Sequence, residues 1–475
     1  MKKQSRRKFI TNLGSATAGV GAFMSYSAIP GEPKIRQLKK ELPVIGDFDI
    51  CVLGGSCTGV FAAVRAARLG ARVAIIEKMN AFGGVATNSM VNVWHSLMNT
   101  EFNRQIIAGM TVEVIERLFK REAVFRSDKS ASVGVTFNSQ ELKIELDEII
   151  TEAGVKPYLH TLFSEPYLDT AGNLGGIIVD NKSGRAIIKA QYFIDATGDA
   201  DLCYRLGCNT YTFDLLQPPT MCALFDGWNM KVFDDLLREH GKEFNIPDGF
   251  VWGARVPPTQ VQMLAGTRIY NVDCSKADDL TKAEIEGRRQ VRAIMDMIRK
   301  YSKETKVGLV GLPSQLGMRE TRHVKCLYQV SDQDALYGKP FEDAIANGSY
   351  RLDIHHQDKP GLTFRYLDGT EVYSRPGYPE EKKRWRENLP VDPTFYQVPL
   401  RALIPRKFDN LIIAGRMLDA SMIAFSGIRV MVNMNQLGEA AGVTSYLALH
   451  QNKSIRDVDY KNVREELAKG GSIII

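Results

Sequence analysis

The sequence predicts an α/β fold with a discontinuous nucleotide-binding domain and a large insertion. Three apolar segments, at residues 49–53, 192–196 and 410–414, support this prediction because each is followed within two residues by a glycine. Short apolar runs rich in branched residues are typical of strands buried on both faces of a parallel sheet. The third segment comes far downstream of the second, so we expect an inserted domain between them.

The first of these segments opens a βαβ unit. Residues 54–59 form a glycine-containing turn, residues 60–69 place apolar side chains at helical spacing, and residues 72–76 form a second apolar run. Such a turn lets the backbone approach a diphosphate, whose charge then lies at the N-terminus of the helix. The unit therefore predicts a Rossmann-like dinucleotide-binding domain.

The glycine fingerprint G-x-G-x-x-G is matched in part. Gly54 and Gly59 occupy its first and third glycine positions, and Ser56 occupies the second. Serine is small and is able to donate a hydrogen bond to phosphate. Glu77 follows the second strand at the offset of about 20 residues where a carboxylate accepts hydrogen bonds from a ribose. Together these residues predict dinucleotide binding.

The composition excludes several classes of protein. The chain has 475 residues, enough for two or three domains, and 44% of them are hydrophobic, which is ordinary for a globular protein. The net charge is +6, but five positive charges and no acid lie in the first 30 residues, so nothing indicates a nucleic-acid partner. Seven cysteines include no C-x-x-C pair, so neither a metal site nor an iron–sulfur site is expected. We interpret Cys203 and Cys208 as small buried thiols.

Residues 1–30 are interpreted as a targeting segment. SRRKFI, at residues 5–10, is a twin-arginine core, and a mild Ala/Gly/Val run leads to small residues at Ser25 and Ser27. The run is too short for a comfortable membrane span. We predict export to the periplasm or another extracytoplasmic compartment, with membrane association through the signal at most and residues 31–45 as a linker. An uncleaved signal that acts as an anchor is the alternative.

A second small-residue turn favours a flavin over a nicotinamide cofactor. GGVAT, at residues 83–87, is positioned to pass against a diphosphate and a flavin ring edge, whereas an NAD domain does not need it. Residues 140–153 predict a helix, residues 157–195 a strand meander with a turn at DTAGN, and residues 430–449 a further helix. We expect FAD as the cofactor.

Several long motifs are spread over almost the whole length of the chain that follows the signal. They are GGSCTG with Glu77, GGVAT, FIDATGDADL, LPSQLGMRETR, YRLDIHH, YQVPLRALIP and NLIIAGRMLDASMIAFSGIRVMVNMNQLGEAAG. In this order they resemble the FAD-dependent oxidoreductase family of bacteria, which shares its flavin core with the fumarate-reductase and heterodisulfide-reductase flavoproteins. We therefore assign residues 46–203 and 401–475 to the FAD-binding domain and residues 204–400 to an α+β substrate domain.

The resemblance also implies the cofactor contacts. The glycine turn with Glu77 would hold the ADP half, the GGVAT turn and Gly198 would line the diphosphate, and residues 415–419 with 429–431 would approach the ribityl chain and pyrimidine ring. The predicted cofactor-binding residues are Gly54, Gly55, Ser56, Thr58, Gly59, Glu77, Lys78, Gly83, Gly84, Thr87, Gly198, Asp199, Gly415, Arg416, Asp419, Arg429, Val430 and Met431.

Two histidines are candidate catalytic bases. In YRLDIHH, Asp353 and His355 lie two apart and would share one face of a strand, where the acid orients an imidazole that takes an alcohol proton. His356 would then point elsewhere. His95 lies soon after GGVAT, at the end of a strand that could reach the flavin, and covalent flavin attachment is a further possibility. A surface ion pair for Asp353 and a structural role for His95 are the alternatives.

Arginines are the candidate substrate clamps. Strand alternation in GMRETRH would place Arg319 on one face and would pair Glu320 with Arg322 on the other, and Arg401 is a further candidate. A structural salt bridge is the alternative for each arginine.

These observations predict an FAD-dependent oxidoreductase. It would transfer hydride between flavin N5 and a small polar substrate, either a hydroxylated sugar or an organic acid. No second glycine fingerprint follows residue 90, so an external electron acceptor or donor is expected in place of a built-in NAD(P)H domain. Reduction of an unsaturated carboxylate, or a flavin-fold binding or escort role without turnover, are the alternatives.

Overall fold

The computed structural model describes residues 41–475 except residues 128, 131, 248–250, 303–305, 357 and 376–377. The predicted export signal and most of the predicted linker lie outside the described residues. Residues 42–475 form one compact unit. Within the described part of the chain, no helix is long and apolar enough to cross a lipid bilayer.

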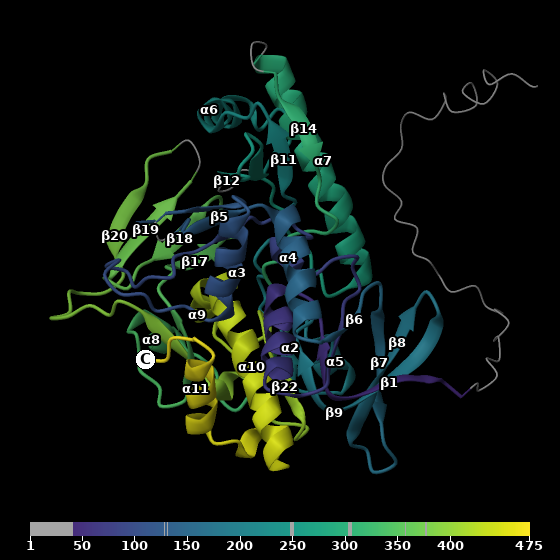
Figure 1. Ribbon diagram of the computed structural model, residues 1–475. Coiled ribbons are helices and arrows are strands. Elements are labelled where there is room, and N and C mark those ends of the chain that lie inside the picture. The colour runs from purple at the N-terminus through teal and green to yellow at the C-terminus, as the bar shows by residue number, and fades with distance from the viewer. Residues whose placement is uncertain are drawn as a thin grey trace, which may run out of the picture. The chain divides into compact units, whose positions relative to one another are not determined.

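A seven-stranded sheet organises the fold (Figure 1). Its strands in spatial order are β6 (Lys156–Tyr158), β2 (Val73–Ile76), β1 (Val44–Leu53), β9 (Gly184–Asp195), β8 (Leu174–Asn181) and β7 (Leu162–Leu168), and β22 (Leu411–Ile413) also pairs with β9. β1 pairs in parallel with β2 and β9, and β22 is parallel to β9, whereas β7, β8 and β9 form antiparallel hairpins. The predicted α/β class and the predicted strand meander are confirmed.

The three predicted glycine turns meet at one end of this sheet. Leu53 pairs with Asp195, and Asp195 pairs in turn with Ile413. The C-terminal ends of β1, β9 and β22 therefore lie side by side, and the glycine turns follow them directly. An open parallel sheet binds its ligand at this edge.

Two glycines set the distance between α2 (Cys57–Arg68) and α10 (Met431–Gln451), which lie side by side in Figure 1. A Cβ atom at Gly438 would lie 2.1 Å from the carbonyl oxygen of Thr58, and one at Gly442 would lie 2.2 Å from that of Ala62. Only glycine permits such an approach. The contacts advance in the same direction along both helices, so both helix N-termini face the same end of the sheet.

Three further helices cover this pair. α3 (Met110–Lys120) packs against α4 (Ser139–Glu152) and α10, α4 also packs against α2, and α11 (Tyr460–Lys469) packs against α10. The helix predicted at residues 140–153 is confirmed as α4, which begins after an Asn138 side chain that accepts a hydrogen bond from the Gln140 amide at 3.0 Å. Asparagine is a favoured N-cap because it satisfies an amide that lacks an intrahelical partner.

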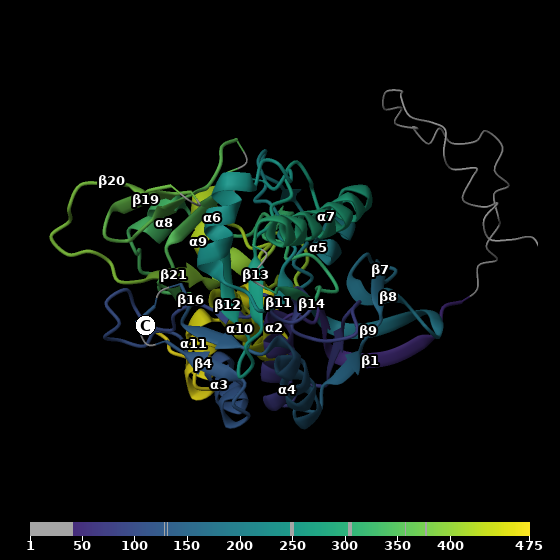
Figure 2. The same ribbon diagram turned by 90° about the horizontal axis from the view of Figure 1, so that it is seen from above.

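The first part of the insertion is an antiparallel sheet with two helices. The sheet contains, in order, β12 (Trp252–Arg255), β13 (Gln262–Ala265), β11 (Ala223–Asp226) and β14 (Gly308–Gly311), and the helices are α6 (Met230–His240) and α7 (Ala277–Tyr301). α7 is the long teal helix of Figures 1 and 2. Its apolar side packs with β11 and β13 into a separate hydrophobic cluster.

The second part of the insertion returns the chain to the start of α10. β17 (Leu352–His355), β18 (Leu362–Arg365), β19 (Thr370–Ser374) and β20 (Glu381–Arg384) form an antiparallel sheet, and β17 packs against the short helix α9 (Met422–Ile428). β16 (Ala344–Gly348) pairs with β21 (Tyr396–Pro399) and packs on α10. β17 therefore lies beside the segment that leads into α10.

The prediction of a strand across GMRETRH is wrong. Only its last residue lies in a strand, β15 (His323–Val324), which pairs with β10 (Thr210–Tyr211). Gly317 forms one isolated bridge with Thr220, and the residues between are irregular. Gly317 pairs with Thr220 and His323 pairs with Tyr211, so the residues between them connect two separate pairings. Their side chains therefore do not alternate between two faces of one sheet.

Candidate active site

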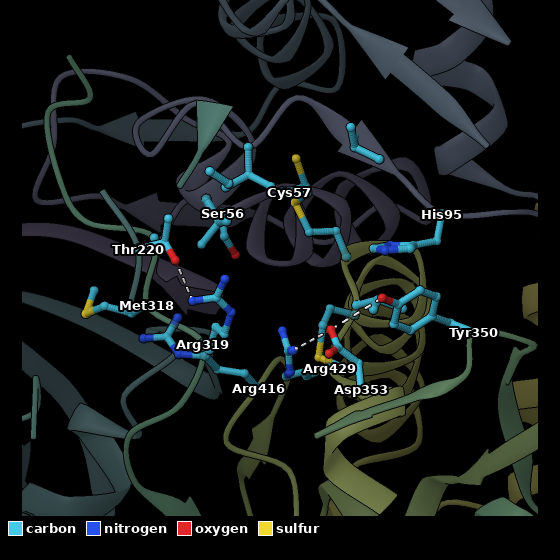
Figure 3. Close-up of a pocket in the computed structure, with 18 of the residues that line it drawn as sticks. Ser56, Cys57, His95, Thr220, Met318, Arg319, Tyr350, Asp353, Arg416 and Arg429 are labelled. Atoms are coloured by element: carbon cyan, nitrogen blue, oxygen red, sulfur yellow. Dashed lines mark hydrogen bonds and ion pairs between the residues drawn. The ribbon is translucent and has the colours of Figure 1, made fainter. Parts of the chain in front are cut away.

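One cavity joins the end of the parallel sheet to the insertion (Figure 3). Its floor comes from the starts of α2 and α10 and from the glycine turns, and its opposite wall comes from β3 (Val93–Trp94), β12, β13, β17 and β18. The predicted cofactor residues that line it are Ser56, Thr58, Gly83, Gly198, Gly415, Arg416, Arg429, Val430 and Met431. The predicted cofactor and catalytic segments thus meet in one space.

The first glycine turn is shaped by close backbone packing. Gly54 has a φ of +100°, and a Cβ atom there would lie 2.4 Å from the carbonyl oxygen of Ala196. A Cβ atom at Gly59 would lie 1.9 Å from the oxygen of Gly54. Ser56 is the N-cap of α2, and its side chain accepts a hydrogen bond from the Gly59 amide at 3.5 Å. Its hydroxyl proton remains available to a phosphate oxygen at the mouth of the helix.

The second small-residue turn lies directly against the first. Gly83 bridges Ser56, and the Gly83 amide donates to the Gly55 carbonyl at 2.7 Å. Gly84 would bring a Cβ atom to 2.8 Å from that of Ser56. The structure therefore brings GGSCTG and GGVAT together, and both turns line the cavity, the first through Ser56 to Thr58 and the second through Gly83 and Val85.

Glu77 follows β2 and is only 8% exposed. Its two carboxylate oxygens accept hydrogen bonds from the Gly55 amide at 2.7 Å and from the Met79 amide at 2.8 Å. Each oxygen retains a lone pair, so the carboxylate is able to accept a ribose hydroxyl as well. Lys78, the next residue, is exposed and does not line the cavity.

The start of α10 faces the cavity with unpaired donors. Val430 is its N-cap, Met431 is its first residue, and no side chain caps this end. The amides of the first turn carry the positive end of the helix dipole. Asn435 adds a buried Oδ1 atom that has no hydrogen-bond partner among the described residues. At Gly415, whose φ is +119°, an added Cβ would meet only the Met417 sulfur, at 3.5 Å. These features fit a diphosphate and a polar ring edge of FAD.

Three predicted cofactor residues have other partners and do not line the cavity. Asp419 is buried and accepts hydrogen bonds from Tyr211, Gln329 and Cys326, each at 2.9 Å. Asp199 pairs with Arg416, which does line the cavity. Thr87 is also buried, and its hydroxyl donates to a backbone carbonyl at 2.5 Å. The contacts of Asp419 hold the adjoining segments together, and its contact with the ribityl chain stays a prediction.

The predicted Asp353 and His355 pair is in contact. His355 Nε2 lies 3.2 and 3.3 Å from the two carboxylate oxygens of Asp353, and both residues line the cavity. Arg429 Nη2 lies 3.1 Å from Asp353 Oδ2, and the Tyr350 hydroxyl donates to the same oxygen at 3.3 Å (Figure 3). His356 instead contacts Thr363, as predicted.

The charges of this pair follow from its surroundings. Burial opposes ionisation of Asp353, but the neighbouring His355 and Arg429 hold its pKa below the usual range. Burial lowers the pKa of His355 to about 3, against the opposing effect of Asp353. At neutral pH the carboxylate is ionised and only accepts hydrogen bonds, so His355 Nε2 carries the proton and Nδ1 carries a lone pair. That is the protonation state of a base.

His95 lies in the same cavity, directly after β3 (Val93–Trp94). Its ring centroid is 4.0 Å from that of Tyr350, and its Nδ1 is buried without a partner among the described residues. Burial lowers its pKa to about 3, so it is neutral at pH 7. His95 is therefore a second neutral imidazole in the cavity, beside Tyr350.

The predicted arginines separate into two groups. Arg319 lines the cavity, where it donates to the Thr220 hydroxyl at 2.6 Å. Arg322 lies outside it, paired with Asp201 at 2.9 Å and stacked on Tyr204. The pairing expected between Glu320 and Arg322 is wrong, because Glu320 contacts His323 at 3.1 Å.

Arg401 also lies outside the cavity, in an ion pair with Asp343 at 2.9 Å. Sequence reasoning missed Tyr350, Arg351 and Thr220 as lining residues. Tyr350 and Arg351 are the first two residues of YRLDIHH, so their place in the same motif as Asp353 and His355 could have identified them. Thr220 has no such signal, because only the pairing of β11 with β13 and the bridge to Gly317 bring it to the cavity.

Comparisons with known proteins identify the family of the chain. A family model described as "FAD dependent oxidoreductase" matches residues 49–467. Mitochondrial dihydrolipoyl dehydrogenase of Schizosaccharomyces pombe is 27% identical over 111 residues, which are 21% of each chain, so the match spans about a fifth of that relative.

Two solved structures are similar to this chain at low identity. A geranylgeranyl bacteriochlorophyll reductase-like protein of Thermoplasma acidophilum is 12% identical, with a TM-score of 0.44 over 90% of this chain and 84% of that one. A myxobacterial chondrochloren halogenase is 12% identical, with a TM-score of 0.44 over 90% and 79% of the two chains.

Proposed function

Because the chain belongs to the family of FAD-dependent oxidoreductases, we propose that it oxidises the hydroxyl-bearing carbon of a small polar substrate with His355 as the base. The observation that carries this proposal is the contact between Asp353 and a neutral His355 inside the cavity that the FAD-binding turns line. The chain is an enzyme of the oxidoreductase class, and FAD is its cofactor.

Most of the residues that would hold FAD form the floor of the cavity, whereas Glu77 lies outside its lining, hydrogen-bonded to the Gly55 amide. Ser56 and the start of α2 would receive the diphosphate, Glu77 the adenosine ribose, and the start of α10 the polar edge of the ring. When bound, FAD supplies an acceptor for hydride at N5.

The protein side of the reaction is proton transfer. His355 Nδ1 would take the proton of the substrate hydroxyl while the carbon-bound hydrogen leaves with its electron pair, so the substrate becomes a carbonyl compound. Asp353 stabilises the imidazolium that forms, and Arg429 and Tyr350 keep Asp353 ionised and in position. The electrons would leave the enzyme through an external acceptor, such as a quinone, oxygen or a redox protein.

We also propose that residues 1–30 direct export and that the acceptor is met outside the cytoplasmic membrane. The twin-arginine core supports this, since that route carries proteins already folded around a cofactor.

Anaerobic bleaching of the flavin tests the function. Purified holoenzyme is mixed with hydroxy acids, sugars and enoates, and its visible absorbance is followed. Bleaching by a hydroxylated compound and not by an enoate is expected. Failure of every hydroxylated compound, with reoxidation of a chemically reduced enzyme by an enoate, would instead support the reduction of an unsaturated carboxylate.

A further inference from the structure

The cavity carries more positive than negative charge. Arg319, Arg351, Arg416 and Arg429 line it, whereas Asp353 is the one carboxylate among the described residues that line it. Two of these charges are neutralised, because Arg429 pairs with Asp353 and Arg416 pairs with Asp199. Arg351 stacks on an aromatic ring, with its guanidinium carbon 3.7 Å from the centroid of Phe364. Arg319 is the one of these four arginines that has neither an acidic partner nor an aromatic ring against it among the described residues.

Arg319 is held by neutral groups only. Its Nη1 donates to the Pro218 carbonyl and to the Thr220 hydroxyl, and no acidic side chain of the described residues forms an ion pair with it. Arg268 donates to the same Thr220 hydroxyl at 3.2 Å and to the Thr267 carbonyl at 2.7 Å. Two guanidinium groups thus share one uncharged oxygen.

This arrangement is unfavourable without a further partner. Burial, together with the charges of Arg268 and Arg429, holds the pKa of Arg319 well below its ordinary value. A buried charge is costly unless an opposite charge neutralises it. Because Arg319 faces the cavity, an anion that enters the cavity would supply the missing charge.

We propose that Arg319 binds a carboxylate of the substrate, so that the enzyme acts on a hydroxy acid. The guanidinium of Arg319 uses Nη1 to hold its own position, and its other nitrogens form no hydrogen bond with the residues that the structure describes, so they can form the paired hydrogen bonds that fit a carboxylate. This inference rests on the proposed function, since it names the class of substrate that the same site accepts.

The position of Arg319 relative to the base supports this substrate class. Figure 3 shows Arg319 with Thr220 on one side of the cavity, and Asp353, Arg429 and Tyr350 on the other. A hydroxy acid has two polar ends that fit this arrangement. Its carboxylate would bind Arg319, and its hydroxyl would lie near Asp353 and His355.

The remaining wall favours an acid over a sugar. Apolar side chains also line the cavity, from Val91, Val93, Met318, Trp252 and Leu362. A sugar would leave several hydroxyl groups against this wall without hydrogen-bond partners, which is costly.

Ligand binding to oxidised holoenzyme tests the proposal without turnover. Glycolate, lactate, malate and succinate are titrated against the flavin spectrum, with lactamide as the neutral counterpart of lactate and with inorganic phosphate and glucose as further probes. We expect carboxylates to perturb the spectrum, and lactamide and glucose to do so at least about 10-fold more weakly. Phosphate binding as tightly as every carboxylate would contradict a site that is specific for carboxylates.

The variants are Arg319→Gln and Arg319→Lys, and the matched control is Arg401→Gln, an arginine outside the cavity. Arg319→Gln should weaken carboxylate binding by about 10- to 100-fold, Arg319→Lys should weaken it less, and the control should leave it unchanged. FAD content and melting temperature are measured for each. Unchanged carboxylate binding in Arg319→Gln, or loss of FAD from both Arg319 variants, would overturn the proposal.

The result separates this inference from the proposed function. Arginine-dependent binding of carboxylates without flavin reduction by any hydroxy acid would support the subsite and contradict oxidation of a hydroxyl group. Reduction by hydroxy acids at the same rate and half-saturation in wild type and Arg319→Gln would support the oxidation and contradict the subsite.

Discussion

Asp353 and His355 are two residues apart on β17, and their side chains meet at 3.2 Å on the face that lines the cavity. Arg429 joins them from the segment that leads into α10, so the insertion and the cofactor domain contribute to the same ion cluster. The proposed base, His355, is thereby fixed relative to the helix N-terminus that would hold the flavin ring.

The helix spacing can be tested by adding one methyl group. Gly438→Ala would place a Cβ atom 2.1 Å from the Thr58 carbonyl oxygen, so α2 and α10 must separate. We expect a loss of about 1 to 3 kcal/mol of unfolding free energy and weaker FAD binding, measured by denaturant unfolding and flavin fluorescence. Gly175→Ala is the control, because a Cβ atom there would meet nothing within 4 Å. Equal stability of the two variants would refute the close approach.

Glu77 tests the ribose contact. Glu77→Ala removes the acceptor expected for the ribose hydroxyls, so FAD binding should weaken by about 1.5 to 3 kcal/mol, the value of a hydrogen bond to a charged group. Equilibrium dialysis of holoenzyme measures this change. Glu165→Ala, at an exposed ion pair with Arg185, is the control. Full flavin occupancy of Glu77→Ala after extensive dilution is the result that would exclude this role.

Export depends on the arginine pair. Replacement of Arg6 and Arg7 by lysine should leave flavin-loaded protein in the cytoplasm, because the twin-arginine route reads this pair as an address. Cell fractionation with flavin absorbance measures the distribution. Replacement of Lys2 and Lys3 by arginine is the control and should not change it. Normal export of the lysine variant would show that SRRKFI is not the signal.

The local pattern of the sequence predicted the elements that depend on neighbouring residues. The βαβ unit, the helix α4 and the shared face of Asp353 and His355 all follow from spacing along one strand or helix. The environment of Arg319 did not follow from spacing, since its segment is irregular and its partners Pro218 and Thr220 are about 100 residues away. Tertiary pairing, which no local pattern encodes, decides which of the arginines faces the cavity.

Acid should destabilise the protein through His355. Its side chain is 6% exposed and its pKa in the folded state is about 3, against 6.5 for the ordinary imidazole. Below pH 6.5 the unfolded chain binds a proton that the folded chain does not, so this contribution to stability is complete above pH 6.5 and falls as the pH drops toward 3.

Between pH 7 and pH 5 the loss from this histidine is about 2 kcal/mol, at about 1.4 kcal/mol for each unit below 6.5. Denaturant unfolding at the two pH values should show that His355→Gln loses less stability than wild type by this amount. The same loss in both proteins would contradict a neutral, buried His355.

The proposed role of His355 as the base is tested most directly by stopped-flow reduction of the flavin in His355→Ala. Asp353→Asn, the double variant and His95→Ala are measured in parallel. We expect His355→Ala to slow flavin reduction by about 10²- to 10⁴-fold, with FAD content and the flavin spectrum intact. Asp353→Asn should slow it in the same direction, and the double variant should be little slower than His355→Ala, because the two residues act as one unit. Near-normal reduction per folded molecule in His355→Ala, with a collapse in His95→Ala, would contradict the assignment of His355 as the base and would assign that role to His95.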